Sequence, residues 1–201
     1  MVANWGLLLE RDYTTALEER VGALPDGLRE HVERVPAGAA ILAHRFGVDA
    51  QRVDTAALAH DLARAEPPAA LLAYARQRGW RLAPVEEAFP MFLHGVVGAD
   101  IARALGVDDA AVLEAAGCHT TGRAGMSEVA MVLFVADKLE PGKAARFRGL
   151  GRARSWATRD LPRAALEVLT WMVRYYAGRG ELLHPDTVAA RNELLLERSK
   201  S

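Results

Sequence analysis

The sequence predicts an all-α protein, and three observations support that prediction. Residues that favour helices, such as Ala, Leu and Arg, are abundant, whereas aromatic residues make up only 6% of the 201 residues. Apolar residues recur every three or four positions, and Gly or Pro interrupts the pattern at intervals typical of helices. No run with the two-residue period of a β-strand stands out, and neither does an internal repeat. We therefore expect a helical bundle.

Composition and charge narrow the class of protein further. The chain is 51% apolar and 25% charged, which is typical of a folded domain with an apolar core and a solvated, charged surface. No apolar run approaches the length of a membrane span. The formal net charge of −1 gives no basic field that would attract nucleic acid or anionic lipid. The N-terminus lacks a signal-peptide pattern, and the single cysteine, Cys118, excludes an intrachain disulfide. We expect a cytoplasmic protein without membrane or nucleic-acid partners, and a homodimer is compatible with the sequence.

The first half of the chain should contain five helices. They are expected at 3–22, from Asp26 to about Phe46, from Asp49 to before Pro67, at 69–78, and from Phe92 to Leu105. Asp26 is expected near the start of the second helix as an N-cap, and Asp49 at that of the third. Pro36 lies inside the second helix and should kink or break it. Residues 80–90 contain two prolines and are expected to be irregular.

The second half should contain four helices and a basic stretch. The helices are expected from Asp108 to about His119, over Glu128–Leu139 with Ser127 as the N-cap, at 162–177, and from Pro185 to about Arg198. The sequence TTGRAG at 120–125 has the composition of a loop. Residues 143–163 carry seven basic residues and one acidic residue. That stretch is either a solvated face or a rim that attracts phosphate, and its place after Lys138 favours the rim.

Six polar side chains lie on the apolar stripes of different predicted helices. The central pair, His60 and Asp61, shares a helix face with Val53, Ala57 and Arg64 in the stretch DTAALAHDLAR. The full set is His31, His60, Asp61, His94, His119 and Asp137.

A shared metal centre explains this set of residues better than separate core histidines. A single histidine on an apolar stripe is usually satisfied by a hydrogen bond in the core. Four histidines with two carboxylates would carry a heavy desolvation cost unless something bound them together. Imidazole nitrogens and carboxylate oxygens form mixed sites suited to iron, manganese, cobalt or zinc. The sequence therefore predicts a pair of divalent cations.

The order of these residues, His, His-Asp, His, His, Asp, resembles that of the HD-domain phosphohydrolases. Longer runs are similar to the bacterial YqeK-type HD-domain proteins, which are symmetrical bis(5'-nucleosyl)-tetraphosphatases. These runs are LREHVERV (28–35), ALAHDLAR (57–64), FLHGVVGADIA (92–102), CHTTGRAGMS (118–127), VLFVADKLEP (132–141) and ELLHPDTVAARNELL (181–195). The resemblance covers roughly residues 25–197, and HTTGRAGM and ADKLEP are its most specific motifs.

The resemblance implies a fold, a ligand set and an activity. The fold would be an HD-domain helical bundle in one domain over residues 1–201, with an N-terminal helix in 1–24, the metal-site core in 25–142 and completing helices in 143–201. One metal ion would bind His31, His60, Asp61 and Asp137, and a second would bind His94 and His119, with Asp61 bridging. The ions would be iron in preference to manganese, cobalt or zinc. The activity would be hydrolysis of diadenosine tetraphosphate to two molecules of ADP.

Several residues are candidates for binding the phosphate groups or for assisting their hydrolysis. Two metal ions lower the pKa of a bound water and clamp the attacking and leaving oxygens. Asp61 or Asp137 could relay a proton, and Arg64 and Lys138 could stabilise charge on the phosphoryl group. The loop after His119 offers hydroxyl groups, backbone N–H groups and a guanidinium as further phosphate ligands. These loop candidates are Thr120, Thr121, Gly122 and Arg123.

The remaining histidines, the cysteine and three aromatic residues have simpler expected roles, and two other functions stay open. His44 is expected on the outer face of its helix, and Cys118 should be a small buried residue. His184 should dock the last helix through Pro185, with a place at the edge of the substrate site as the alternative. Trp171, Tyr175 and Tyr176 are expected in the core, where one of them could stack on adenine. The alternative functions are another HD phosphohydrolase, acting on nucleoside monophosphates or a guanosine alarmone, and a regulatory module that senses a metal.

Overall fold

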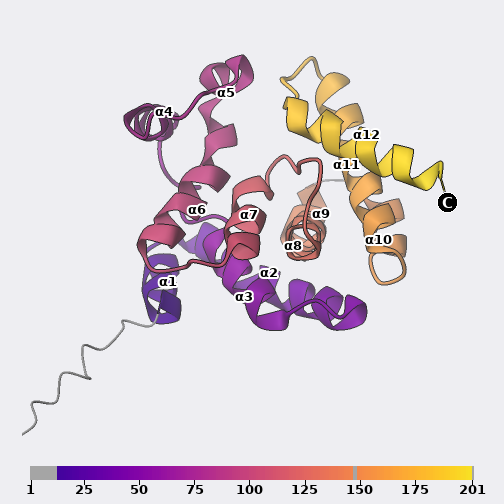
Figure 1. The fold of residues 1–201 in the computed structure, drawn as a ribbon, viewed down its shortest axis with the longest axis horizontal. Helices are drawn as coiled ribbons and strands as arrows, with labels where there is room; N and C mark the ends of the chain where they lie inside the picture. The colour runs from indigo at the N-terminus through magenta and orange to yellow at the C-terminus, as the bar shows by residue number, and fades with distance from the viewer. Residues whose placement is uncertain (1–12, 147–148, 201) are drawn as a thin grey trace, which may run out of the picture.

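The computed structural model describes residues 13–146 and 149–200 (Figure 1). All regular structure in these two ranges is helical, and they contain no strand. This confirms the all-α prediction. None of the helices in the described ranges is long and apolar enough to cross a membrane.

The helices follow one another with short connections. The first group comprises α1 (Tyr13–Gly22), α2 (Asp26–Phe46), α3 (Ala50–Ala59), α4 (Pro68–Gln77), α5 (Pro84–Ala88), the 3₁₀ helix η1 (Pro90–Leu93) and α6 (His94–Ala104). The second group comprises α7 (Ala110–Cys118), α8 (Glu128–Leu139), α9 (Pro141–Arg146), α10 (Gly151–Trp156), α11 (Leu161–Ala177) and α12 (Pro185–Arg198).

Helix α8 is the centre of the bundle. It packs against α2, α3, α7 and α11, so neighbours surround it, and Figure 1 shows it between the α6–α7 side and the α10–α12 side. Its sequence, EVAMVLFVADKL, is apolar from Val129 to Ala136, and the buried residues include Asp137. A helix that is apolar on all sides is stable only when it is enclosed. Asp137 therefore lies in the interior because it belongs to the central, enclosed helix of the core.

Two glycines let α6 approach the ends of α3 and α7. A Cβ atom on Gly95 would lie 2.7 Å from the carbonyl oxygen of Gly117, and one on Gly98 would lie 3.2 Å from that of Ala59. Any larger residue at Gly95 would push α6 away from α7. The motif HGVVG thus fixes where the start of α6 meets the ends of the two neighbouring helices.

The prediction that His60 and Asp61 lie inside a helix is wrong. Helix α3 ends at Ala59, His60 is its C-cap, and Asp61 lies in the turn that follows, where the Arg64 N–H bonds to the Asp61 carbonyl. The His60 Nδ1 atom lies 2.6 Å from the Ala57 carbonyl oxygen. His119 is likewise the C-cap of α7 rather than a residue within it. Both residues keep right-handed helical backbone angles, so their side chains leave the backbone in the direction that the helix would give them.

Other differences from the expected elements are local. Pro36 does not break α2, because the buried face of that helix holds both halves in place, including Val32, Val35 and Ala39. The N-cap of α2 is Pro25 rather than Asp26.

Two further differences concern an N-cap and an additional helix, and one predicted N-cap is confirmed. The N-cap of α7 is Asp109 rather than Asp108, because the Asp109 carboxylate accepts from the N–H groups of Ala111 and Val112. Residues 84–88 form a helix inside the segment expected to be irregular, and Pro84 begins it. Ser127 caps α8 as predicted. Residues 3–12 of the expected first helix lie outside the described residues.

Candidate metal centre

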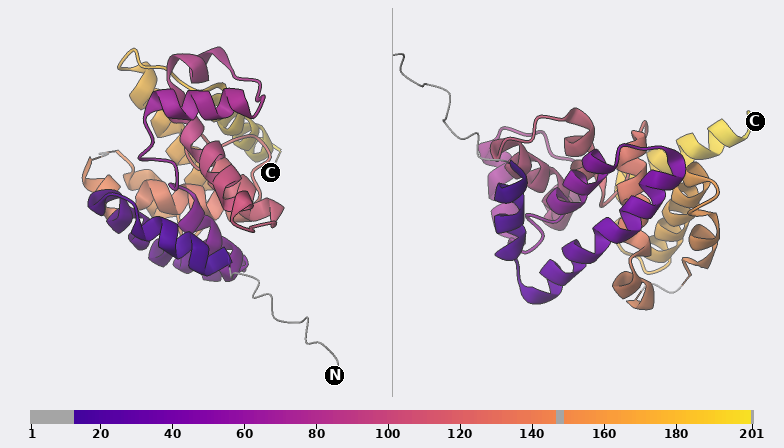
Figure 2. Two further views of the ribbon diagram at one scale, coloured as in Figure 1. Left: turned by 90° about the vertical axis from the view of Figure 1, so that its left-hand side faces the viewer. Right: turned by 90° about the horizontal axis from the view of Figure 1, so that it is seen from below.

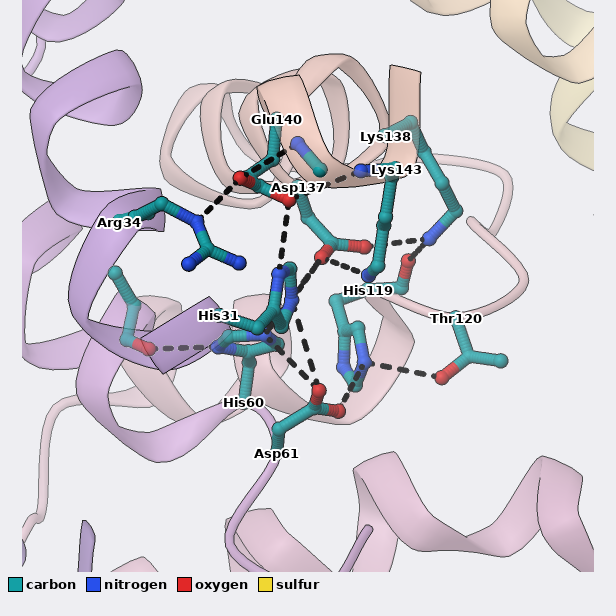
Figure 3. A network of polar contacts seen from close by, with 12 residues as sticks. His31, Arg34, His60, Asp61, His119, Thr120, Asp137, Lys138, Glu140 and Lys143 are labelled. Atoms are coloured by element: carbon teal, nitrogen blue, oxygen red, sulfur yellow. Dashed lines mark hydrogen bonds and ion pairs between the residues drawn. The ribbon is translucent and has the colours of Figure 1, made fainter. Parts of the chain in front are cut away.

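The six predicted ligands converge in the interior, and Figure 3 labels all of them except His94. They come from α2, the end of α3, the start of α6, the end of α7 and the last turn of α8, and each is at most 7% exposed. They are His31, His60, Asp61, His94, His119 and Asp137. Residues spread over more than 100 positions of the chain thus share one site, as the sequence predicts.

The carboxylate of Asp61 lies between two groups of histidines. Its Oδ2 atom is 3.7 Å from His31 Nε2 and 3.5 Å from His60 Nε2. Its Oδ1 atom is 3.2 Å from His94 Nε2 and 3.3 Å from His119 Nε2. One oxygen therefore faces each histidine pair, which is the arrangement of a bridging ligand.

Each side of Asp61 has its own compact set of donor atoms. On one side, His31 Nε2 is 3.0 Å from Asp137 Oδ1 and 3.3 Å from His60 Nε2. On the other side, the Nε2 atoms of His94 and His119 are 3.2 Å apart. Two groups of donors are compact enough to hold a metal ion. His31, His60 and Asp137 form the first group, and the second group joins His60 of one side to Asp61 and His119.

Three of the four histidines are oriented by the carbonyl group three residues earlier in the chain. The Nδ1 atoms of His60, His94 and His119 lie 2.6, 2.5 and 2.7 Å from these carbonyl oxygens. A carbonyl oxygen only accepts hydrogen bonds, so each Nδ1 carries the proton and each Nε2 of the neutral ring keeps a lone pair. The carbonyls belong to Ala57, Met91 and Ala116.

The fourth histidine is oriented by Glu140, which the sequence analysis did not single out. His31 Nδ1 lies 3.3 Å from Glu140 Oε2, and the same carboxylate accepts hydrogen bonds from Arg34 and from the backbone of Gly142 and Lys143. Burial opposes the ionisation of Glu140, but these bonds outweigh it and lower its pKa to about 2. An ionised Glu140 keeps the proton on His31 Nδ1, so its Nε2 also points a lone pair into the centre.

The donor set fits a pair of divalent cations. Four imidazole lone pairs and two carboxylates face one another across 3.0–3.7 Å, an arrangement that is repulsive without positive charge between them. Asp61 Oδ1 is buried and has no hydrogen-bond partner among the described residues. Mixed nitrogen and oxygen donors of this kind suit iron, manganese, cobalt and zinc.

Charges around the ligands tune their protonation. Burial opposes ionisation of Asp61, but the charge of the neighbouring His60 outweighs it and holds the pKa of Asp61 well below the ordinary value. The pKa of Asp137 is also well below the ordinary value, because Lys138 and Lys143 outweigh its burial. Burial lowers the pKa of His119 to about 3. Both carboxylates are therefore charged and His119 is neutral at pH 7, the forms that bind metal.

The segment that carries the six candidate ligands matches a known protein family. Residues 28–142, which include all six ligands, match the HD domain. The chain belongs to the HD-domain family.

Relatives of this HD-domain protein extend over most of its length. It is 32% identical over 172 residues to a protein of Halalkalibacterium halodurans. The aligned region covers 84% of this chain and 89% of the relative. It is also 32% identical over 184 residues to a protein of Bacillus subtilis, covering 89% of this chain and 97% of the relative. Both relatives are named symmetrical bis(5'-nucleosyl)-tetraphosphatase. The chain therefore belongs with that group of HD-domain proteins.

A solved structure has the same fold. It is the crystal structure of a predicted HD superfamily hydrolase involved in NAD metabolism from Clostridium acetobutylicum. The two structures superpose with a TM-score of 0.85 and 30% sequence identity, covering 92% of this chain and 97% of the other.

A cavity of about 630 Å³ opens onto the ligands of the HD-domain protein. Five of the six ligands line it, together with basic side chains and an apolar wall. The basic residues are Arg34, Arg64, Lys138 and Lys143. The apolar and aromatic residues include Leu28, Trp171, Met172 and Tyr176. The cavity therefore contains both basic side chains beside the candidate ligands and an apolar surface large enough to contact a planar ring.

The structure brings some of the predicted phosphate ligands to this cavity. The Thr120 hydroxyl lies 3.1 Å from His94 Nε2 and 3.2 Å from His119 Nε2, and Arg64 lines the cavity with an exposed side chain. Lys138 Nζ donates to Asp137 Oδ2 at 2.8 Å and to the His119 carbonyl at 2.7 Å. Lys138 therefore links two ligands as well as facing the cavity.

The other three predicted phosphate ligands lie elsewhere. Thr121 and Arg123 line a second cavity, of about 840 Å³, and Arg123 lies 3.6 Å from Glu114. Gly122 is buried with a φ of +66°, and a Cβ atom there would lie 3.1 Å from Leu169. The αL conformation of Gly122 turns the chain after Thr120 away from the metal centre.

Lys143 is the described residue of the basic stretch 143–163 that lines the first cavity. Its ammonium group is in contact with Asp137 Oδ1. Other members face different partners, since Arg152 and Arg163 lie 3.1 and 2.9 Å from Glu167. The prediction that the stretch forms a rim therefore applies to Lys143 and not to Arg152 or Arg163.

The remaining histidines follow the sequence analysis. His44 is exposed, and His184 is the N-cap of α12, where its ring accepts from the Asp186 N–H. Cys118 is buried, and burial raises the pKa of its thiol to about 12. None of these three residues lies among the ligands.

Replacing Glu140 with glutamine should destabilise the metal-free protein in a pH-dependent way. The pKa of Glu140 falls from 4.5 to about 2 on folding, so its carboxylate stabilises the fold fully above pH 4.5 and progressively less as pH falls toward 2. We expect E140Q to lose about 1–3 kcal/mol at pH 7. Thermal unfolding in chelator should show the difference from wild type shrinking between pH 4.5 and pH 2.

The control for this variant is Glu30→Gln. Glu30 also contacts Arg34, at 3.4 Å, but it is exposed. Its replacement should change the melting temperature little at any pH. An E140Q deficit that stays constant across the same pH range would contradict the assigned role of the charge.

Proposed function

We propose that this HD-domain protein hydrolyses symmetrical dinucleoside tetraphosphates, converting diadenosine tetraphosphate to two molecules of ADP. The observation that carries the proposal is the position of Asp61, with one carboxylate oxygen toward each pair of histidines. The names of the relatives from H. halodurans and B. subtilis support the substrate class.

The proposed cofactor is a pair of divalent metal ions, with iron preferred to manganese, cobalt or zinc. His31, His60, Asp61 and Asp137 would hold one ion, and His94, His119 and Asp61 would hold the other. When bound, such a pair lowers the pKa of water and polarises a phosphoryl oxygen. Thr120, with its hydroxyl beside the Nε2 atoms of His94 and His119, is placed to hydrogen-bond a phosphate oxygen there.

The basic side chains of the cavity would bind the phosphate chain. The substrate carries four anionic phosphates, and Lys138, Arg64 and Arg34 supply positive charge along one wall. Lys138 has three N–H donors and uses two on Asp137 and the His119 carbonyl, which leaves one for a phosphate oxygen. In this arrangement Lys138 stabilises charge that develops on the transferring phosphoryl group. Asp61 is the candidate for relaying the proton.

The apolar wall of the cavity would bind one nucleoside. Trp171, Met172 and Tyr176 come from α11, and Leu28 faces them from α2. An aromatic side chain stacks on a purine with little regard to its identity. Fixing one nucleoside and its two phosphates on this wall would place the middle bridge of the tetraphosphate at the metal centre, which explains symmetrical cleavage.

Product analysis tests the proposal directly. Protein purified without oxygen and supplied with iron or Mn²⁺ should convert diadenosine tetraphosphate to ADP alone, with little release of phosphate from AMP. ATP with AMP as products would indicate asymmetrical cleavage and contradict the proposal. Faster hydrolysis of nucleoside monophosphates or of a guanosine alarmone would favour another HD phosphohydrolase. Protein that binds metal but acts on none of these nucleotides would favour a metal-sensing module.

The proposed setting is the cytoplasm. Cys118 is the single cysteine of the chain and is buried, so the described structure uses no disulfide. A thiol whose pKa is about 12 stays protonated and unreactive at neutral pH.

A further inference from the structure

Lys143 lies inside the set of ligands rather than beside it. Its ammonium contacts Asp137 Oδ1, the same oxygen that lies 3.0 Å from His31 Nε2 and 3.7 Å from His60 Nε2 (Figure 3). His31, His60 and Asp137 are also one of the two groups of donors compact enough to hold a metal ion. The lysine therefore supplies a positive charge at the oxygen that the first ion would use.

We propose that Lys143 holds the place of the first metal ion in the metal-free protein and becomes a phosphate ligand when that ion binds. The second half of this statement rests on the proposed function. A metal ion on Asp137 Oδ1 and an ammonium on the same oxygen would bring two cations together, and their repulsion drives the lysine away. Lys143 lines the cavity, so the displaced ammonium stays in the space where the phosphate chain would lie.

The two lysines on Asp137 differ in their freedom to move. Lys138 binds the other carboxylate oxygen, Oδ2, and is held a second time by the His119 carbonyl; its side chain is 13% exposed. Lys143 has one described partner, and its side chain is 27% exposed. Lys138 is therefore part of the fixed frame, whereas Lys143 has a route into the cavity.

The backbone of Lys143 stays in place while its side chain moves. The N–H groups of Gly142 and Lys143 donate to the Glu140 carboxylate, at 2.9 and 3.1 Å. The same carboxylate holds His31, a ligand of the first ion. Glu140 thus fixes the start of α9 against the metal centre, and the swing is confined to the lysine side chain.

Lys143→Met tests the proposal, because it keeps the aliphatic chain and removes the charge. Without a competing ammonium, metal-free protein should bind the first Mn²⁺ about tenfold more tightly, measured by calorimetry with Mn²⁺ alone. Its melting temperature in chelator should fall, because the ligand carboxylate has lost its counter-charge. The Mn²⁺-loaded variant should bind ADP about tenfold more weakly, because one charge-assisted hydrogen bond is missing. The three effects differ in sign, which a general structural defect would not produce.

Arg64→Met is the matched control for charge. Arg64 lines the same cavity without an ion pair to Asp137 among the described residues, so its loss should change Mn²⁺ affinity by about twofold or less. Lys143→Gln also removes the charge but keeps a polar end group. It can be measured in place of Lys143→Met if the Met variant is poorly soluble. Lys143→Arg keeps the charge and should retain the melting temperature of the metal-free protein.

Unchanged or weaker Mn²⁺ binding in both neutral Lys143 variants would overturn the proposal, even if the wild type hydrolyses diadenosine tetraphosphate. Tighter Mn²⁺ binding with unchanged ADP binding would overturn the phosphate role alone and leave the place-holding role supported. If the wild type proves inactive on every nucleotide, the Mn²⁺ and melting measurements still decide the place-holding role. The failure of this proposal and that of the proposed function are therefore distinguishable.

Discussion

Replacing Asp61 with alanine is expected to abolish turnover of diadenosine tetraphosphate and to empty at least one metal position. Within residues 13–146 and 149–200, Asp61 is the one carboxylate whose two oxygens face both histidine pairs, at 3.2–3.7 Å. Its loss removes a ligand from both ions and the bridge between them, so we expect turnover to fall on the order of a thousandfold or more. Metal analysis of the purified variant, beside a product assay, measures both effects.

The control for D61A is Asp100→Asn. Asp100 is also a buried carboxylate, 6% exposed, but it binds Tyr74, Arg78 and Arg103 away from the ligands. Folded D100N should keep the metal content of the wild type. Wild-type turnover and metal content in D61A would contradict the assignment of Asp61 as the bridge.

Removing metal with a chelator should lower the melting temperature by about 10 °C and stop hydrolysis. An ion present at about a thousand times its dissociation constant contributes about 4 kcal/mol, and for a chain of this size each kcal/mol corresponds to about 2–4 °C. The physical cause is the loss of positive charge between the ligands, because Lys138 and Lys143 contact Asp137 whereas Asp61 Oδ1 has no hydrogen-bond partner among the described residues. Differential scanning calorimetry with and without chelator, followed by return of Mn²⁺, measures the shift and its reversal.

D61A provides the control for that experiment. Without the bridging carboxylate, Mn²⁺ should raise the melting temperature of the variant far less than that of the wild type. An equal rise in both proteins would mean that the stabilising ion binds at a different place.

The helical fold and the convergence of the six candidate ligands were predictable because both follow from the same pattern. A polar residue on the apolar stripe of a helix is carried inward with that stripe, and His31 and Asp137 arrive in this way on α2 and α8. The end of α7 before His119 was predicted to within one residue, whereas the end of α3 at Ala59 was not. At that end a Cβ atom on Gly98 would lie 3.2 Å from the Ala59 carbonyl oxygen, so α6 packs there against a segment that is far away in the sequence.

Residues beyond the ligands were harder to place for a different reason. Thr120 and Thr121 are neighbours in the sequence, yet Thr120 lies at the metal centre and Thr121 lines the other cavity, because the turn at Gly122 separates their directions. Glu140 and Lys143 reach the centre because α8 ends at Leu139 and α9 begins at Pro141. Sequence spacing alone does not give the angle between two consecutive helices.

The hydrogen bonds from Nδ1 to a carbonyl three residues back make three of the imidazoles self-orienting. For His60, His94 and His119, the proton position and the direction of Nε2 are set within a four-residue segment of backbone. Such a segment is a transferable unit. Protein designers could graft it onto the end of an unrelated helix and obtain an aimed metal ligand without copying the surrounding bundle.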